Sequence, residues 1–352
     1  MTQEDTCCIM VEVMCGVVAQ LGARYHGTVE VVGSNPIDST TIGGSRLKFL
    51  LPLFLVVFFL RIYGIEIFFD EEILPITLNL INSARESVKL VSFGVTHPDV
   101  VEALKSLEAN GVKVTVVTDS ESYCPLTHIV DTLPGLVHEK FLIIDSKTVL
   151  AGTMNFTVSG LKSDQNVAVL IEKSEAPEIF EAFLREFSNF QNGFFQNSKI
   201  PVKAESERVK LVFAPRYDPF QWISRILANA RKEVLVAAYA FTDPQLTTVL
   251  KYLNSEGIDV KVLLDKRWNT ENSYSEHVFL EGGIEVSLFP SPSHMHAKLI
   301  LVDERWLLMG SANFTASARK KNDEFLMIID SPELVMKARK WFFDLWKDAG
   351  SL

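Results

Sequence analysis

The residues of this sequence with the clearest chemical meaning form a motif that occurs twice. Each copy reads His-x-Lys, then Asp seven residues after the histidine, then Gly-Thr or Gly-Ser with Asn three residues after the glycine. A histidine can attack phosphorus or move a proton, and lysine and asparagine can hold phosphate oxygens. Two copies facing each other predict a symmetric cradle that cleaves a phosphodiester through a covalent phosphohistidine. The residues concerned are His138, Lys140 and Asn155 in the first copy and His296, Lys298 and Asn313 in the second.

A β-strand is the element that would align these side chains. Alternate residues of a strand share one face, so His138 and Lys140 would point one way and Glu139 the opposite way. The second copy repeats this alternation. In both copies four apolar residues follow the lysine (Phe-Leu-Ile-Ile or Leu-Ile-Leu-Val), which indicates a buried strand.

The remaining motif residues receive supporting roles. Asp145 and Asp303 come at the end of the predicted strand, too far along it to reach the histidine easily, so we interpret them as structural residues that hold the following turn. Thr153 and Ser311 belong to turns that bring small residues and amides near an oxyanion. We therefore predict that Thr153 and Ser311 contact the substrate.

The motif lies inside a longer repeat. A single His-x-Lys is weak evidence, because a histidine bonded on a sheet beside a solvated lysine gives the same pattern. Here residues 84–98 also align without gaps on residues 230–244, at an offset of 146 that grows to 158 at the histidines. Two equally spaced copies within a wider duplication favour a functional site, with a longer loop before the second motif.

Each repeat predicts alternating strands and helices. Pro98 and Pro244 fit the first turn of a helix, and Gly111 and Gly257 fit the left-handed residue that ends it. Apolar runs rich in β-branched residues flank these helices and predict strands at 88–95, 112–118, 234–241 and 258–264.

Such alternation predicts an α/β fold with sheets covered by helices. We assign the first repeat to residues 65–195, a polar linker to residues 196–208 and the second repeat to residues 209–352.

Composition narrows the functional classes. The formal net charge of −10 argues against strong non-specific binding to nucleic acid, which depends on lysine and arginine. Three of the four cysteines lie within the first fifteen residues, which leaves Cys124 without a partner for a disulfide in the repeats. No Cys/His spacing matches a zinc site, and we predict no metal ligand.

The N-terminal part differs from the repeats. Residues 47–64 are strongly hydrophobic, but the uncharged run from Phe49 to Leu60 has only twelve residues, fewer than the roughly 20 that span a bilayer. Arg46 and Lys48 before the run fit a signal or an uncleaved anchor. We expect a membrane-anchored, extracytoplasmic protein, secreted if the segment is cleaved. A buried core element is the alternative.

Residues 1–46 are expected to be a leader that is untranslated or disordered. The stretch 18–41 resembles the translation of a transfer-RNA gene, which would place the natural start near Leu47. No function is assigned to this segment.

The doubled motif resembles the signature of the phospholipase D superfamily over nearly the whole chain from about residue 65. The Phe/Tyr-x-x-Thr-x-Pro stretch ending at Pro98 and Pro244 is similar to its small bacterial nuclease-like and cardiolipin-hydrolase-like branch. The resemblance implies two α/β repeats about a pseudo-twofold axis, with one shared active site, so that a monomer suffices.

The same resemblance implies a mechanism. One histidine attacks phosphorus, while the other protonates the leaving alcohol and then activates water. The lysines and asparagines of both motifs hold the non-bridging oxygens, and no cofactor is required because two lysines supply the positive field.

The family usually places a carboxylate eleven residues after the asparagine, bonded to histidine. The second copy has Glu324 there, whereas the first has Asn166, which we assign to substrate binding. A carboxylate partner favours imidazolium. With Glu324 beside His296, we predict that His296 is the general acid and His138 the nucleophile.

Three functions remain open. The first is phospholipase D-type hydrolysis of a phospholipid to phosphatidate and a free head group, at a membrane reached through the N-terminal segment. The second is an endonuclease acting on DNA or RNA phosphodiesters. The third, a catalytically inactive binding module, is disfavoured because both motifs are complete. The hydrophobic N-terminus and acidic composition favour lipid.

Overall fold

The computed structural model describes residues 65–269 and 274–351. The expected leader 1–46 and hydrophobic segment 47–64 lie outside the described residues. The first repeat contains β1 (Glu66–Phe69), η1 (Asp70–Glu72), α3 (Ile73–Ser83), β2 (Ser87–Val91), α4 (Pro98–Ala109), β3 (Lys113–Asp119), β4 (His128–Asp131), β5 (Phe141–Ile144), β6 (Thr148–Gly152), α5 (Val158–Lys162), β7 (Val167–Glu172) and α6 (Pro177–Gln191).

The joining segment and the second repeat follow. They contain η2 (Gln196–Ser198), β8 (Lys203–Glu205), β9 (Val209–Ala214), α7 (Pro219–Leu227), β10 (Glu233–Ala238), α8 (Pro244–Ser255), β11 (Asp259–Asp265), α9 (Tyr274–Glu281), β12 (Glu285–Phe289), β13 (Lys298–Val302), β14 (Trp306–Gly310), α10 (Ala316–Lys320), β15 (Glu324–Asp330), α11 (Pro332–Asp348) and β16 (Gly350–Ser351).

Each repeat builds one mixed sheet. The strand order is β1-β7-β6-β5-β2-β3-β4 in the first and β16-β12-β11-β10-β13-β14-β15-β9-β8 in the second. Without the edge strands β16 and β8, the two orders correspond strand for strand. In both sheets an equivalent pair of strands joined by a helix is parallel, β2 and β3 around α4 and β10 and β11 around α8. The predicted α/β class is confirmed.

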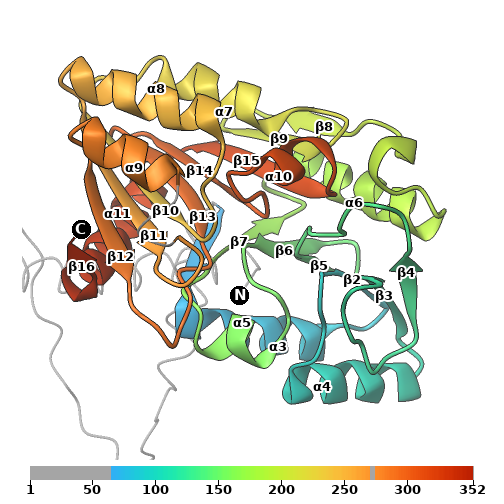
Figure 1. The fold of residues 1–352 in the computed structure, drawn as a ribbon. Helices are drawn as coiled ribbons and strands as arrows, with labels where there is room; N and C mark the ends of the chain where they lie inside the picture. The colour runs from blue at the N-terminus through green and yellow to red at the C-terminus, as the bar shows by residue number, and fades with distance from the viewer. Residues whose placement is uncertain (1–64, 270–273, 352) are drawn as a thin grey trace, which may run out of the picture. The chain divides into compact units, whose positions relative to one another are not determined.

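Helices cover the outer faces of the two sheets, and a shared core lies between them. Helices α3 and α4 pack on the first sheet and α7 and α8 on the second (Figure 1). Between the sheets, Phe183 of α6 lies 5.2 Å from Phe141 of β5 and 5.5 Å from both Phe213 and Phe325 of the second sheet, measured between ring centroids. Buried aromatic pairs add to apolar burial, so α6 joins the two repeats into one core.

The local signals in the sequence are reproduced. Pro98 and Pro244 are the first residues of α4 and α8. Gly111 and Gly257 have φ values of 83° and 88°, in the left-handed region. The strands predicted at 88–95 and 234–241 end earlier, at Val91 and Ala238, because the chain then leaves the sheet to reach the motif turns, where Val95 pairs with Phe156 and Phe241 with Phe314.

The motif glycines end their strands where another strand approaches closely. A Cβ atom at Gly310 would lie 2.2 Å from the backbone oxygen of Phe325 on β15. We expect Gly310→Ala to lower the free energy of unfolding by about 1–3 kcal/mol, as overpacking does. Gly111→Ala is the control. A Cβ atom at Gly111 would meet no other atom within 4 Å, so only the positive φ opposes the substitution. We expect it to lower the free energy of unfolding by about 1 kcal/mol. Urea unfolding compares them, and an equal or smaller loss at Gly310 would contradict the steric argument.

Among the described residues, no helix is both long enough and apolar enough to cross a membrane.

Candidate active site

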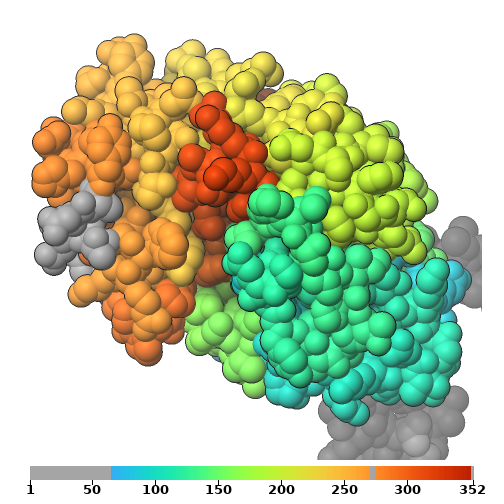
Figure 2. Space-filling view, turned by 45° about the vertical axis from the view of Figure 1, so that its right-hand side comes forward, coloured from blue at the N-terminus to red at the C-terminus, as the bar shows by residue number. Residues whose placement is uncertain are grey.

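The two histidine motifs meet where the repeats join. His138 lies in an extended segment just before β5, and its backbone N–H donates to the carbonyl of Asp323 in the second repeat at 3.0 Å. In the same way, the N–H of His296 donates to the carbonyl of Gln165 in the first repeat at 3.0 Å. The segment that leads into each motif strand, β5 or β13, is therefore fixed by the opposite repeat. Figure 2 shows the green first repeat and the red end of the second meeting at the surface, beside the yellow-green stretch that includes α6.

The side chain of His138 is held by a carboxyl group from the second repeat. Its Nδ1 lies 2.9 Å from Oε2 of Glu324. Glu324 is fully buried and also accepts from the Ser311 hydroxyl at 2.6 Å and from the Asn322 amide at 3.2 Å. Burial raises the pKa of Glu324 to about 8, although Lys140 and these two hydrogen bonds oppose the shift.

The side chain of His296 is held by an amide from the first repeat. Its Nδ1 lies 3.0 Å from Oδ1 of Asn166. That oxygen also accepts from the Thr153 hydroxyl at 2.8 Å, and the Asn166 amide nitrogen donates to the Gly160 carbonyl at 3.0 Å. The two histidines thus have equivalent surroundings, except that one faces a carboxyl group and the other a neutral amide.

The predicted pairing of Glu324 with His296 is wrong, because Glu324 contacts His138. Glu324 does lie eleven residues after Asn313, as the family pattern requires. However, it is the first residue of β15, and that end of the strand lies beside His138 of the first repeat.

Thr153, Ser311 and Asn166 are fully buried and hydrogen-bonded within the protein. Asn166 bonds to His296, Thr153 bonds to Asn166 and Ser311 bonds to Glu324. Their contact with substrate stays a prediction.

The two motif lysines, Lys140 and Lys298, are buried. The ammonium of Lys140 donates to the carbonyl of His138, and that of Lys298 donates to the carbonyl of His296 at 2.5 Å. Burial lowers the pKa of Lys140 to about 7. Burial, followed by repulsion from Lys140, lowers the pKa of Lys298 well below its usual value. Two buried lysines with lowered pKa values favour an anionic ligand, because its charge would raise both pKa values again.

The histidines respond to the same field. Burial, then Lys140 and Lys298, lowers the pKa of His138 well below its usual value. Burial, then the two lysines and His138, does the same for His296. The imidazoles are therefore neutral near pH 7, and each is close enough to sense both lysines.

The motif asparagines leave polar atoms open at the site. The Oδ1 atoms of Asn155 and Asn313 are buried and have no hydrogen-bond partner among the described residues. Buried polar groups are usually satisfied. An amide oxygen accepts, so these two atoms suit a ligand that donates a hydrogen bond, whereas a phosphate oxygen would be held by the Nδ2–H groups of the same side chains.

The motif aspartates lie at the far end of the strand and hold a different turn from the one predicted. The Asp145 carboxylate accepts from the backbone N–H groups of residues 85–87 at 2.8–2.9 Å. Asp303 accepts from residues 231–233 at 2.8–3.2 Å. These turns precede β2 and β10, so the aspartates tie the start of each repeat to its motif strand.

Two aromatic residues beside the histidines received no role from the sequence. The ring centroid of Tyr239 lies 5.0 Å from that of His296, and Phe93 lies 6.3 Å from His138. The two aromatics occupy equivalent positions in the repeats. That equivalence was the signal that could have identified them.

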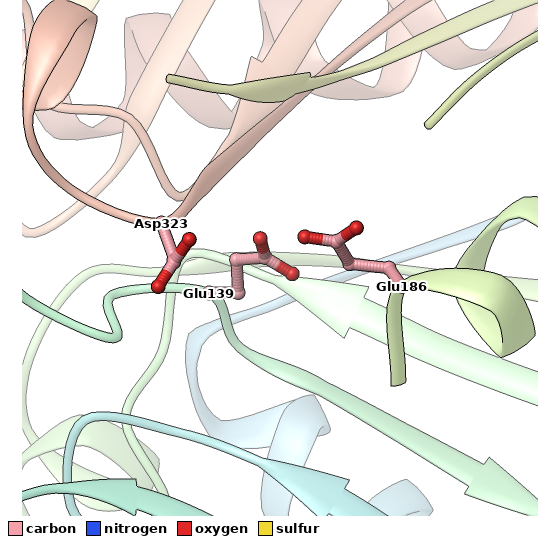
Figure 3. Close-up of side chains that lie close together, drawn as sticks. All are labelled: Glu139, Glu186 and Asp323. Atoms are coloured by element: carbon pink, nitrogen blue, oxygen red, sulfur yellow. The ribbon is translucent and has the colours of Figure 1, made fainter. Parts of the chain in front are cut away.

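A third buried cluster lies on the opposite side of the motif strand. Carboxyl oxygens of Glu139, Glu186 and Asp323 lie within 4.8 Å of one another, close enough to share a cation, and Figure 3 shows the three groups turned toward one another. The cation at this place is the ammonium of Lys199, which contacts all three.

Comparisons with known proteins place the chain in a family. A family model described as "Cardiolipin synthase, PLD-like domain" matches residues 77–190 and 223–346. A phospholipase D of Rickettsia bellii (strain RML369-C) is 33% identical over 128 residues, which cover 36% of this chain and 63% of that protein. Human mitochondrial cardiolipin hydrolase is 31% identical over 123 residues, covering 35% and 49% respectively. The match thus spans less than two thirds of either relative.

Among solved structures, a phosphatidylserine synthase from Haemophilus influenzae Rd KW20 has a similar fold. The TM-score is 0.62 at 13% identity, covering 82% of this chain and 87% of the other. At that identity the likeness concerns the fold alone.

Proposed function

The chain belongs to the family of phospholipase D-like domains, and from this premise we propose that it is a phosphodiesterase with one active site formed by both repeats. The observation that carries the proposal is the crossed pairing of the histidines. His138 is bonded to Glu324 and His296 to Asn166, each across the junction. Neither repeat alone contains a complete histidine environment, so a monomer with both repeats suffices.

The crossed pairing removes the sequence argument that made His296 the general acid, because the carboxyl group lies on His138. We propose His138 as the nucleophile on a different ground. The attacking form requires ionised Glu324, which the raised pKa of about 8 favours only towards higher pH. Its carboxylate then accepts a hydrogen bond from the Nδ1–H of His138 and leaves the Nε2 lone pair free. Nε2 then forms a bond to phosphorus as the bond from phosphorus to the leaving oxygen breaks. The carboxylate also stabilises the positive charge that develops on the substituted imidazole.

His296 would act on the other side of the phosphorus. Burial and the two lysines lower its pKa, but an anionic ester offsets the two lysines and favours the imidazolium. The Nε2 proton of His296 passes to the leaving alcohol. The neutral imidazole then takes a proton from water, whose oxygen attacks phosphorus and releases His138.

Lys140, Lys298, Asn155 and Asn313 would hold the non-bridging oxygens and stabilise the charge of the transition state. These four polar side chains come in equal numbers from the two repeats, which suits the two equivalent oxygens of a diester. The positive field of this mechanism comes from the chain's own lysines.

A phospholipid is the substrate we favour, cut to phosphatidate and a free head group. The similarity to proteins named phospholipase D and cardiolipin hydrolase supports this choice, as does the net charge of −10, which disfavours polyanions. Nucleic acid is the second candidate. The observation in its favour is the exposed Trp268, 53% accessible, whose ring lies 5.3 Å from Tyr239 and could stack a base. We further propose that residues 47–64 anchor the protein to a membrane, with the repeats outside the cytoplasm.

The test is the purified full chain assayed with EDTA present on phospholipid vesicles and on labelled single-stranded DNA and RNA. We expect phosphatidate from the vesicles, with the variant His138→Asn/His296→Asn as the inactive control. Cleavage of nucleic acid without lipid hydrolysis would replace our first choice of substrate. Activity lost with EDTA and restored by a divalent ion would contradict a reaction that relies on lysine charges.

A further inference from the structure

The acidic cluster behind the motif strand joins elements that are far apart in the sequence. Glu139 follows His138 in the chain, Glu186 comes from α6, and Asp323 directly precedes β15. Figure 3 shows the three side chains converging. All three side chains are fully buried. Three carboxyl groups in such a place require a compensating cation, because burying unpaired charges is costly.

Lys199 supplies that cation from the segment between the repeats. Its Nζ lies 2.9 Å from Oδ1 of Asp323 and 3.3 Å from Oε1 of Glu139, and it also bonds to Glu186. A further hydrogen bond of 2.9 Å runs to the carbonyl of Ala214, which pairs with Glu324 in the second sheet. One ammonium thus contacts both repeats and α6.

The segment that carries Lys199 is firmly held. The backbone N–H of Gln196 donates to Asp323 at 2.9 Å, and the Gln196 side chain donates to Asp323 at 2.8 Å. Gln196 has a φ of 43°, in the left-handed region that a residue with a side chain rarely adopts. Such strain persists where surrounding contacts over-determine the conformation. The start of the predicted linker is therefore a structural part of the junction.

The charges in this cluster support a permanent ammonium. Burial disfavours the charged form of Lys199, but Glu186, Glu139 and Asp323 outweigh it and raise the pKa above its usual value. Burial raises the pKa of Asp323 to about 7 and, with repulsion from Glu186, raises that of Glu139 well above its usual value. Lys199 opposes both shifts and keeps negative charge in the cluster.

The cluster touches the active site at two points. Glu139 lies between His138 and Lys140 in the chain. Asp323 precedes Glu324, and its backbone carbonyl accepts the hydrogen bond of the His138 N–H. Displacement of either carboxylate would shift the nucleophile relative to the residue that orients it. We propose that Lys199 is a positioning residue, an internal cation that holds His138 of one repeat in register with Glu324 of the other. This inference rests on the proposed phosphodiesterase function.

The proposal also predicts an electrostatic effect on Lys140. Ionised Glu139 favours the charged form of Lys140, so Lys199 indirectly maintains the ammonium that would hold phosphate. Activity that needs this ammonium is lost as pH rises through the pKa of Lys140. The charged and titratable groups that face Lys140 are Glu139, Glu324, Asp119, Lys298, His138 and His296.

Three single variants test the inference in the full-length protein. Lys199→Met removes the cation, Glu186→Gln removes one carboxylate outside the motifs, and Lys203→Met changes an exposed lysine of the same segment as the matched control. The measurements are kcat and KM for bis(p-nitrophenyl) phosphate between pH 5 and 9, and the melting temperature over the same range.

For Lys199→Met we expect kcat to fall on the order of 10²-fold, the loss that a misplacement of about 1 Å causes, with little change in KM. The alkaline limb of kcat/KM should move to lower pH, because Glu139 takes up a proton and the pKa of Lys140 falls. Glu186→Gln should move the limb to higher pH, because less repulsion leaves Glu139 ionised. A general loss of folding would not give shifts of opposite sign.

Stability gives a readout that does not depend on activity. Without Lys199, the carboxyl groups keep raised pKa values, so the folded state binds more protons than the unfolded state and stability falls as pH rises. The melting temperature of Lys199→Met should therefore drop from pH 5 to 8 more steeply than that of the wild type. Lys203→Met should match the wild type in every measurement.

The outcomes distinguish the positioning role of Lys199 from the proposed phosphodiesterase function. A folded Lys199→Met protein with wild-type kcat and an unchanged limb overturns the positioning role. If Lys199→Met does not fold, the test passes to Glu186→Gln. An alkaline limb of its kcat/KM profile at the same pH as in the wild type then overturns the positioning role. A wild type inactive on every phosphodiester refutes the proposed function, while the melting curves still decide whether Lys199 is the compensating cation.

Discussion

Replacing His296 with asparagine is expected to stop the reaction halfway and to leave a phosphoryl group on His138. Bis(p-nitrophenyl) phosphate has a leaving group that needs no general acid, so His138 can still attack. Without His296 no base activates water, and steady-state turnover should fall on the order of 10²- to 10⁴-fold. The measurement is a burst of p-nitrophenolate equal to the enzyme concentration, with mass spectrometry locating the adduct on His138.

The converse variant, His138→Asn, should show neither burst nor adduct and should lose activity on the order of 10⁴- to 10⁶-fold, as removal of a nucleophile does. The exposed His277 provides a control, and His277→Asn should behave as wild type. A phosphoryl adduct on His296 in the His138→Asn protein would reverse the assigned roles.

Glu324→Gln should slow the attack by His138, even though Glu324 lies in the other repeat. A glutamine amide can donate to Nδ1, which leaves the proton on Nε2 and removes the attacking lone pair. We expect a loss on the order of 10²- to 10⁴-fold in kcat. Introduced into the His296→Asn protein, Glu324→Gln should reduce the rate of the burst.

That double variant discriminates between crossed and uncrossed pairing. If Glu324 served His296, the burst would keep its rate once His296 is gone. Ser311→Ala offers a graded comparison, since it removes one hydrogen bond to Glu324 and should cost about three- to tenfold. A larger effect for Ser311→Ala than for Glu324→Gln would contradict the role given to the carboxylate.

Much of the fold followed from local patterns. Prolines at the first turn and glycines with positive φ mark the limits of α4 and α8, because these residues have restricted or unusual backbone preferences. The duplicated motif likewise predicted which histidines and lysines come together. Strand ends were less predictable, since the apolar run continues past Val91 into the turn that Val95 makes with Phe156.

Two errors share one cause. The sequence places Glu324 near the second motif and Asp145 before a turn, so proximity along the chain suggests a partner close by for each. In the structure, both carboxylates bond to groups distant in sequence, Glu324 to His138 and Asp145 to the turn before β2. A repeat reveals equivalent positions but does not show whether a contact is made within one copy or between the two.

The sequence by itself determined the chemistry, because residue types and their strand periodicity are local properties: two imidazoles, two ammonium groups and two amides in matched turns. Only the tertiary structure decided which carboxyl group serves which histidine, and that Lys199, in an apparently polar linker, is buried among three carboxyl groups. The physical reason is that both depend on how two sheets pack across a junction, and no interval along one chain records that arrangement.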